Sequence, residues 1–174
     1  IKPADGDDIF LSILETRIDF DADLIESITD KISEISRQMS VDKDPNRALL
    51  LKITALQEST IAIRENIVEK QRILSSLLKS KMFPKEDYEK MRIMIKDVGS
   101  LIDHTSFNFE RLEFLQNTFL GLVDMEQNRV IKIFTVVTVI FMPPTLIASL
   151  YGMNFHFMPE LDEVWGYPFA LLLM

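Results

Sequence analysis

The sequence predicts an all-α protein in which a long helical stalk continues into a transmembrane helix. Apolar residues recur in steps of three and four along most of the chain, and the few glycines and prolines fall at a small number of positions. Residues 133–151 are almost entirely apolar, and no Lys, Arg, Asp or Glu occurs between Lys132 and Glu160. This run is about the 20 residues that cross the roughly 30 Å hydrocarbon layer of a bilayer. We therefore expect antiparallel stalk helices and one very long helix that enters the membrane.

The first stalk helix is expected to begin at Asp7, which can cap it. Its apolar positions, spaced by three or four residues, are Leu11, Leu14, Ile18, Ile25, Ile28, Ile32, Ile35 and Met39. Asp21 alone interrupts this series. A 3.5-residue period of this length is typical of a helix that packs against a partner helix, as in a coiled coil. Pro45 should end the segment, because it disfavours helical geometry at Asp44.

A second helix, antiparallel to the first, is expected from residue 47 to about residue 81. The positions expected to face a core are Leu50, Ile53, Ile63, Ile67, Leu74 and Leu78, and those expected to face water are Glu58, Arg64, Glu65 and Lys70. Pro84 followed by Glu86 and Asp87 favours the start of a third helix. Nothing before Gly152 would end that helix, so it would cover residues 86–151, roughly 99 Å at 1.5 Å per residue.

Charges on either side of the apolar run predict its orientation. Arg129 and Lys132 precede it, whereas Glu160, Asp162 and Glu163 follow it, so the positive-inside rule places the stalk in the cytoplasm. We expect a multi-pass protein of the cell's inner (plasma) membrane. Its segments would be a cytoplasmic helical or coiled-coil stalk (1–128), a first transmembrane helix (129–151), an extracytoplasmic loop (152–166) and a truncated start of a second transmembrane helix (167–174). The last run is too short to span a bilayer, so we expect a fragment.

Polar residues also recur at helical spacing along the apolar run: Asn128, Thr135, Thr138, Thr145 and Ser149, with Met142 among them. This face predicts either the lining of a water-filled pore or hydroxyls that bond their own helix or a neighbouring helix. Pro143 and Pro144 remove two amide donors, which favours a bend that is either structural or a hinge of a pore.

The sequence resembles the CorA family of magnesium channels at four places: residues 126–129, residues 141–143, the run from Tyr151 through Gly152-Met153-Asn154 to Leu161, and Trp165-Gly166-Tyr167-Pro168. The resemblance implies a homopentamer in which the first span surrounds a pore and Gly152, Met153 and Asn154 form its outer mouth and selectivity filter. It also implies that Asn128, Ile131, Phe134, Met142 and Thr145 face the pore, and Thr138 lies on the polar face described above. Asp97 and Asp103, near His104, are the stalk carboxylates that would hold a regulatory Mg²⁺. His156 is a departure, since many magnesium members of the family have Glu there.

The implied function is conduction of hydrated Mg²⁺, with Co²⁺ and Ni²⁺ as further candidates, into the cytoplasm down the membrane potential, with closure by cytosolic Mg²⁺. Mg²⁺ gives up its waters reluctantly, and the neutral oxygens of Asn154 and Gly152 can accept hydrogen bonds from those waters. Glu160, Asp162 and Glu163 would concentrate cations outside. Mg²⁺ is then both cargo and regulator, no organic cofactor is expected, and the partners are other copies, the bilayer and divalent cations but no nucleic acid.

Two alternatives stay open: a ZntB-like zinc transporter of the same fold, and a membrane-anchored signalling coiled coil that conducts nothing. Residues 158–161, Met-Pro-Glu-Leu, favour magnesium over zinc within the fold. An enzyme is not expected, because the sequence has no Cys, two His and no phosphate-binding glycine loop.

Overall fold

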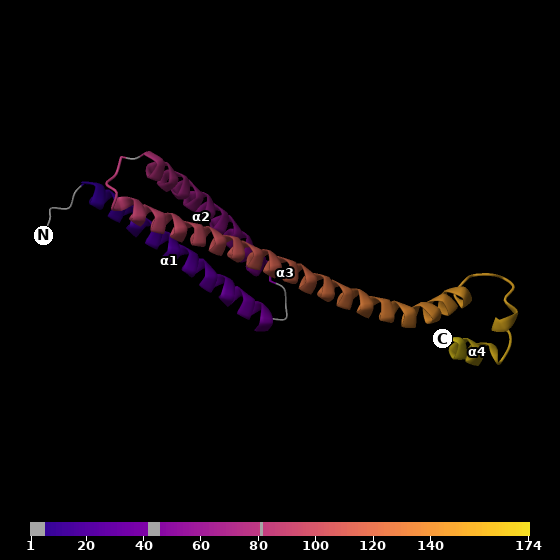
Figure 1. The fold of residues 1–174 in the computed structure, drawn as a ribbon. Helices are drawn as coiled ribbons and strands as arrows, with labels where there is room; N and C mark the ends of the chain where they lie inside the picture. Colours follow the sequence, from indigo (N-terminus) through magenta and orange to yellow (C-terminus); the bar gives the residue numbers. More distant parts are fainter. Residues whose placement is uncertain (1–5, 42–45, 81) are drawn as a thin grey trace. The chain divides into compact units, whose positions relative to one another are not determined.

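The computed structural model describes residues 6–41, 46–80 and 82–174 and confirms the all-α prediction. Its helices are α1 (Gly6–Val41), α2 (Arg47–Ser80), α3 (Asp87–Tyr151) and α4 (Gly166–Leu173), with a 3₁₀ turn η1 (Pro159–Leu161) before α4 (Figure 1). No strand occurs in the described ranges. The predicted break at residues 42–45 and the predicted helix end at Lys81 lie outside them. The chain forms two compact units, Ile1–Leu122 and Val123–Met174, which are described separately below.

In the first unit α1 and α3 run parallel, and α2 runs antiparallel to both. Asp8 of α1 lies beside Lys90 of α3 and, further along both helices, Ser33 lies beside Arg111. Gln57, in the first half of α2, donates a hydrogen bond to Gln116, which lies near the middle of α3. The start of α2 is capped, because the Asn46 side chain accepts a hydrogen bond from the Ala48 N–H at 2.9 Å.

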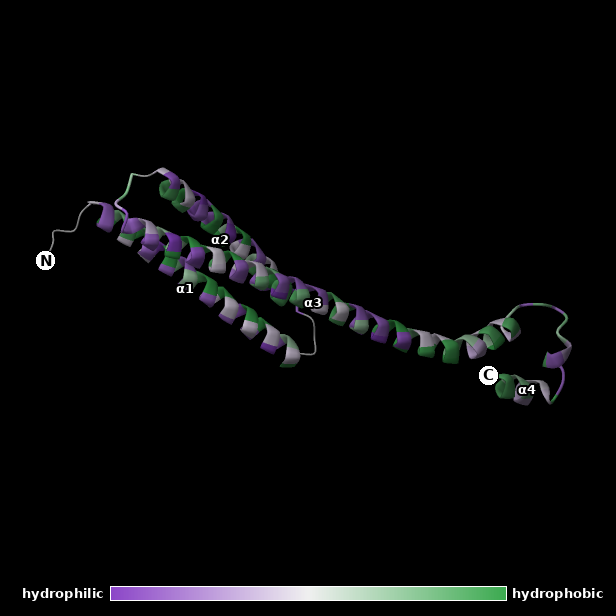
Figure 2. Cartoon of the chain, in the orientation of Figure 1, coloured by the Kyte–Doolittle hydropathy of each residue, from purple (hydrophilic) through white to green (hydrophobic). Residues whose placement is uncertain are grey.

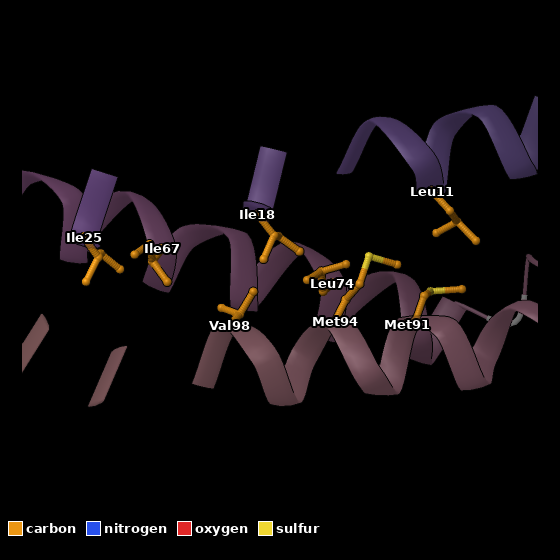
Figure 3. Close-up of a cluster of buried hydrophobic side chains, with 8 residues drawn as sticks. All are labelled: Leu11, Ile18, Ile25, Ile67, Leu74, Met91, Met94 and Val98. Atoms are coloured by element: carbon orange, nitrogen blue, oxygen red, sulfur yellow. The ribbon is translucent and has the colours of Figure 1, made fainter. Parts of the chain in front are cut away.

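Apolar side chains from all three helices form the core of this unit (Figure 3). The cluster contains Leu11, Ile18 and Ile25 of α1, Ile67 and Leu74 of α2, and Met91, Met94 and Val98 of α3. The predicted α1 series is largely confirmed, since Ile28, Ile32 and Ile35 are buried as well. On α2 the buried residues include Leu49 and Thr60, whereas the predicted Leu50 is only partly covered.

Lys70 was predicted to face water, and this prediction is wrong. Its ammonium group pairs with the Asp21 carboxylate, and the two side chains are 15% and 5% exposed. Asp21 lies within the apolar series of α1, and a buried carboxylate without a partner would be strongly unfavourable. The α2 helix supplies that partner, so the interruption in the series is the point where α1 and α2 are joined by charge.

Two further polar residues occupy the buried face of α3. Thr105 and Asn108 are 1% and 3% exposed. Asn108 Nδ2 donates a hydrogen bond to Thr29 Oγ1 at 2.9 Å, and Thr29 donates to the Ile25 carbonyl of its own helix at 2.9 Å. Thr60 of α2 is a further buried polar residue, 2% exposed, and its hydroxyl donates to the Leu56 carbonyl of its own helix at 2.7 Å.

The second unit consists of the end of α3, a loop, η1 and α4. Figure 2 shows that α4 and the last turns of α3 are predominantly hydrophobic, whereas α1 and α2 are mixed. α4 packs against η1 at Gly166, which is buried: a Cβ atom there would lie 1.9 Å from the Glu160 carbonyl oxygen. Trp165 and Phe169 meet edge to face with ring centroids 5.7 Å apart. The loop therefore folds back on the start of α4.

Candidate ion-conducting segment

The last third of α3 is a helix whose apolar surface is uncovered within one chain. By length and composition it contains a stretch able to cross a membrane, and no residue of that stretch is buried. Every residue from 127 to 143 is exposed, including Phe134 at 67% and Met142 at 61%. An apolar surface of this extent marks a site of contact with lipid or with other protein chains.

One face of this stretch collects the polar residues singled out in the sequence. Thr138, Met142 and Thr145 line a shallow groove, together with Val137, Phe141, Leu146 and Ser149. The threonine hydroxyls donate hydrogen bonds to carbonyls one turn earlier: Thr135 to Ile131 at 2.8 Å, Thr138 to Phe134 at 2.8 Å and Thr145 to Phe141 at 2.7 Å. Because each hydroxyl hydrogen is used within the helix, the oxygen lone pairs are left as acceptors.

Pro143 and Pro144 lie inside α3, and the helix continues past them to Tyr151. Neither proline can donate to the carbonyl four residues earlier, so the carbonyls of Val139 and Ile140 lose their usual partners. These two freed acceptors lie within the groove-bearing stretch. Helix interruptions of this kind are tolerated in membrane helices where neighbouring groups satisfy the carbonyls.

The end of the predicted pore face that is nearer to the stalk is also exposed. Asn128, Ile131 and Phe134 are all exposed, and Ile131 is exposed to 58%. Arg129, one residue after Asn128, lies 3.7 Å from the Glu126 carboxylate on the next turn of the helix.

α3 ends in a tight backbone turn at the predicted filter residues. Gly152 N–H donates to the Ala148 carbonyl at 2.9 Å, and Met153 N–H donates to the Leu150 carbonyl at 3.4 Å. A Cβ atom at position 152 would lie 2.9 Å from the Ala148 oxygen, so glycine is required by this contact. Met153 and Asn154 follow it and are exposed. The uncharged amide side chain of Asn154 therefore lies immediately beyond the carboxyl end of the helix.

The loop that follows carries the predicted cation-attracting carboxylates. Glu160, in η1, and Asp162 and Glu163 after it are all exposed, as is His156. No ion pair joins these carboxylates to a basic side chain in the described part of the chain. They therefore leave a negative surface on the loop.

The two stalk carboxylates predicted to hold a regulatory ion lie on different sides of α3. Six residues separate Asp97 from Asp103, which is about 120° around a helix of 3.6 residues per turn. Asp97 borders a hollow against α1 together with Glu15, Asp19 and Lys90, and Asp103 does not. Within the residues that the structure describes, no three His, Cys, Asp or Glu side chains are grouped closely enough to hold a metal ion. The regulatory site stays a prediction.

Lys90, at the edge of that hollow, has a shifted pKa. The hydrogen bond that Lys90 donates to Asp8 at 2.9 Å, together with the charge of Asp8, raises its pKa above the ordinary 10.5. A raised lysine pKa favours the folded state below about pH 10.5, and this contribution is lost as the pH rises through the higher folded value. Since both side chains are more than half exposed, solvent screens the pair and its effect is small.

Sequence reasoning missed the structural role of Gly166 and of Asn108. The available signal for Asn108 was its place between two phenylalanines, Phe107 and Phe109, on the predicted helix. For Gly166 the sequence offered its place between two aromatic residues, Trp165 and Tyr167. Neither signal identifies the partner, which depends on how segments far apart in the sequence meet.

A helical protein with one membrane-capable stretch, one acceptor-lined face and a neutral polar turn at its end belongs to the helical membrane proteins. Comparison with known proteins narrows this class. The family described as CorA-like Mg2+ transporter protein matches residues 1–174, and the chain belongs to this family. The Magnesium transport protein CorA of Wolinella succinogenes is 41% identical over 169 residues, which is 97% of this chain and 53% of that protein.

A second relative bears the same name as the first. The Magnesium transport protein CorA of Helicobacter pylori strain J99 is 37% identical over 174 residues, covering 99% of this chain and 55% of the relative. The solved structure of the CorA magnesium transporter from Methanocaldococcus jannaschii shares the fold, with a TM-score of 0.85 at 24% identity, over 99% of this chain and 55% of that one. The chain spans about half the length of the relatives it matches. Their names describe transport proteins, in agreement with the expectation that the chain is not an enzyme.

Proposed function

We infer that the protein conducts hydrated Mg²⁺ into the cytoplasm through a pore surrounded by several copies of α3, with the membrane potential as the driving force. The observation that carries this proposal is the end of α3: the apolar stretch closes on a turn at Gly152 and presents the neutral amide of Asn154 directly after it. Because Mg²⁺ retains its waters, an oxygen acceptor that bonds those waters suits it better than a carboxylate that would replace them.

The groove on α3 supports the proposal that the cation moves along this helix after it has passed the mouth at Asn154. The outward oxygens of Thr138 and Thr145 can accept hydrogen bonds from the waters of a passing cation. Met142 between them, and Ile131 and Phe134 nearer the stalk, would form apolar rings that stop conduction by dewetting when they close. The uncovered apolar surface of the same stretch agrees with an assembly of copies within lipid, and we expect a pentamer.

We further infer that the stalk closes the pore when cytosolic Mg²⁺ is high. Asp97 and Asp103 are exposed carboxylates of the stalk, and a cation bound to them between neighbouring copies would lower the repulsion between carboxylates. Such an effect couples binding in the stalk to the state of the pore. Co²⁺ and Ni²⁺ are further candidate cargoes, because a site that contacts the water shell distinguishes poorly between hydrated divalent cations.

The test is cation uptake by full-length protein in sealed lipid vesicles, measured with Mg²⁺, Co²⁺, Ni²⁺ and Zn²⁺ in separate samples. Asn154→Ala should abolish most Mg²⁺ uptake. Asn66→Ala, the same truncation at an exposed position of α2, should leave it unchanged. Uptake of Zn²⁺ in preference to Mg²⁺ would instead favour a zinc transporter. No uptake of any cation by the unaltered protein would favour a signalling coiled coil.

A further inference from the structure

The loop between α3 and α4, residues 152–165, carries large apolar side chains that lie uncovered in the structure. Phe155 is 62% exposed, Phe157 is 89% exposed and Val164 is 96% exposed. A loop that lies in water is rich in polar residues, whereas large apolar side chains exposed together within one short segment mark a contact surface. The loop therefore has a binding partner outside the chain.

The most exposed of these residues lies in a β-turn. The Gly166 N–H donates a hydrogen bond to the Glu163 carbonyl at 3.0 Å, which closes a turn with Val164 and Trp165 at its two central positions. Trp165 has φ −84° and ψ −10°, as at the third residue of a type I turn. Gly, Pro, Asn, Asp and Ser favour turns because of their backbone preferences or their hydrogen bonds to the backbone. Val164 and Trp165 offer neither, so turn formation does not account for them.

Two contacts hold this 163–166 turn at the start of α4. Gly166 packs so closely on η1 that a Cβ atom there would lie 1.9 Å from the Glu160 carbonyl oxygen. The Trp165 ring meets Phe169 of α4 edge to face, with centroids 5.7 Å apart. Trp165 nevertheless stays 54% exposed. The backbone of the turn is thus positioned by the chain itself, while its two central side chains are left for a partner.

The surface nearest to the turn in the proposed channel is the outer face of the bilayer. The apolar stretch of α3 ends at Tyr151, and α4 continues from the turn into exposed apolar residues, Leu171, Leu172 and Leu173. A bilayer is about 30 Å thick in its hydrocarbon core and about 40–45 Å with its headgroups, which leaves roughly 5–8 Å of headgroup region on each side. A β-turn, with ends less than about 7 Å apart, fits this depth. Tryptophan and tyrosine are also enriched there.

The charges of the loop favour lipid over the loops of neighbouring copies. Glu160, Asp162 and Glu163 are all exposed, and no Lys or Arg follows Lys132 in the sequence. Loops packed against one another would bring these carboxylates together without a basic residue to pair with them, and like charges repel. A lipid surface can take up the apolar side chains while the carboxylates remain in water.

We propose that the loop rests on the outer surface of the bilayer, with the 163–166 turn and Phe157 among the lipid headgroups. This inference rests on the proposed function, because it needs α3 and α4 to meet the outer surface of the membrane. The carboxylates of Glu160 and Asp162 stay in water, where they attract cations. Lipid contact through the apolar side chains therefore holds the acidic part of the loop close to the mouth at Asn154.

Tryptophan fluorescence tests the contact, because Trp165 is the single tryptophan of the 174 residues. Full-length protein, with any tryptophan outside these residues replaced by phenylalanine, is placed in phosphatidylcholine vesicles. Some of the lipids carry bromine near the headgroup end of the acyl chains, and in separate samples iodide is present on both sides. The Phe157→Trp and Ser59→Trp variants are made on a Trp165→Phe background. Ser59 is an exposed position of α2 and serves as the control.

We expect bromolipid to quench the fluorescence of the unaltered protein and of the Phe157→Trp variant, and iodide to quench the Ser59→Trp variant alone. Quenching of Phe157→Trp by iodide and not by bromolipid would place the loop in water and overturn the inference. Quenching of Phe157→Trp by neither would show that neighbouring copies cover the loop, which also overturns it.

The same measurements separate this inference from the proposed function. If bromolipid quenches Trp165 but not the Phe157→Trp variant, the loop contact fails and the membrane orientation of the channel is kept. If bromolipid fails to quench Trp165 as well, the orientation on which the proposed function depends is overturned. Full quenching in vesicles that take up no Mg²⁺ would overturn the proposed function and leave the lipid contact in place.

The role of the turn is tested by Val164→Asp, which puts a charge at a position proposed to lie among headgroups. Bromolipid quenching of Trp165 should fall and iodide quenching should rise, because the turn would move toward water. Asp162→Asn, a change at an exposed position of the same loop, is the control and should leave both unchanged. Unchanged quenching in Val164→Asp, or an equal change in the two variants, would overturn the role of the turn.

Discussion

At two positions of this protein the backbone packs so closely that glycine is the residue that fits. Gly166 accommodates the Glu160 carbonyl where any Cβ would lie 1.9 Å away, and Gly152 leaves room for the Ala148 carbonyl. Both glycines belong to motifs by which the chain resembles its family. Their physical role is close backbone approach, which holds the loop after Asn154 in one conformation.

Gly166→Ala should loosen the loop between η1 and α4. Forcing a methyl group into this contact costs about 1–3 kcal/mol, and each 1.4 kcal/mol is about a tenfold change in an opening equilibrium. Amide hydrogen exchange over residues 159–170 should therefore accelerate by roughly 5- to 150-fold. Gly6→Ala, where a Cβ meets nothing within 4 Å, is the control and should exchange as the unaltered protein does. Unchanged exchange in Gly166→Ala would refute the contact.

At the scale of helices, the three-helix unit combines apolar clusters with polar links at defined levels. Asp21 pairs with Lys70 between α1 and α2, Asn108 bonds Thr29 between α1 and α3, and Gln57 Nε2 donates to Gln116 Oε1 at 3.0 Å between α2 and α3. A buried polar residue at one position of a helical seam specifies register at a cost in stability. These links therefore fix how far each helix is shifted along its neighbours.

The Thr29–Asn108 link should respond asymmetrically to removal of either partner. Thr29→Val leaves the buried amide of Asn108 without its acceptor, which should lower the free energy of unfolding by about 1–3 kcal/mol. Asn108→Leu should cost less or stabilise, because the Thr29 hydroxyl keeps its hydrogen bond to the Ile25 carbonyl. Thermal unfolding of the purified protein in detergent measures both. Equal destabilisation by the two variants would contradict this assignment.

At the scale of the whole molecule, α3 is a single helix of 65 residues that belongs to both compact units. Its first part carries the buried seam of the stalk, and its last part carries the acceptor-lined groove. The buried seam of the stalk is therefore joined to the groove-bearing stretch by continuous helix without an intervening loop. In the proposed channel the energy for inward movement comes from the membrane potential.

Mg²⁺ influx should depend steeply on the membrane potential. A divalent cation gains roughly 4.6 kcal/mol per 100 mV, twice the value for a single charge. In vesicles with equal Mg²⁺ gradients, a potassium diffusion potential that makes the interior negative should accelerate uptake, and the opposite potential should suppress it. Vesicles with Asn154→Ala show the background leak. An equal rate of uptake under the two potentials would contradict a passive channel and favour coupled transport.

Much of the fold follows from spacing alone, because a three-four apolar series determines which side of a helix is covered. The α1 series and the long α3 helix were predictable for this reason. The partner of Asp21 was not, because the shift between α1 and α2 decides which lysine reaches it. Likewise the Gly166 contact depends on the backbone path of the loop. Asn154 was identified by its motif, whereas the arrangement of copies around it depends on contacts that one chain does not contain.

The threonine hydroxyl hydrogens point to carbonyls of their own helix, and this has a consequence for anions. Each water molecule around a chloride ion turns one hydrogen toward the ion and keeps one outward hydrogen, whereas each water around a cation turns both hydrogens outward to acceptors. Thr135, Thr138 and Thr145 have already committed their hydrogens to α3 and offer oxygen alone. In the proposed channel such a lining pairs better with the water shell of a cation than with that of chloride, and this preference requires no fixed charge in the wall.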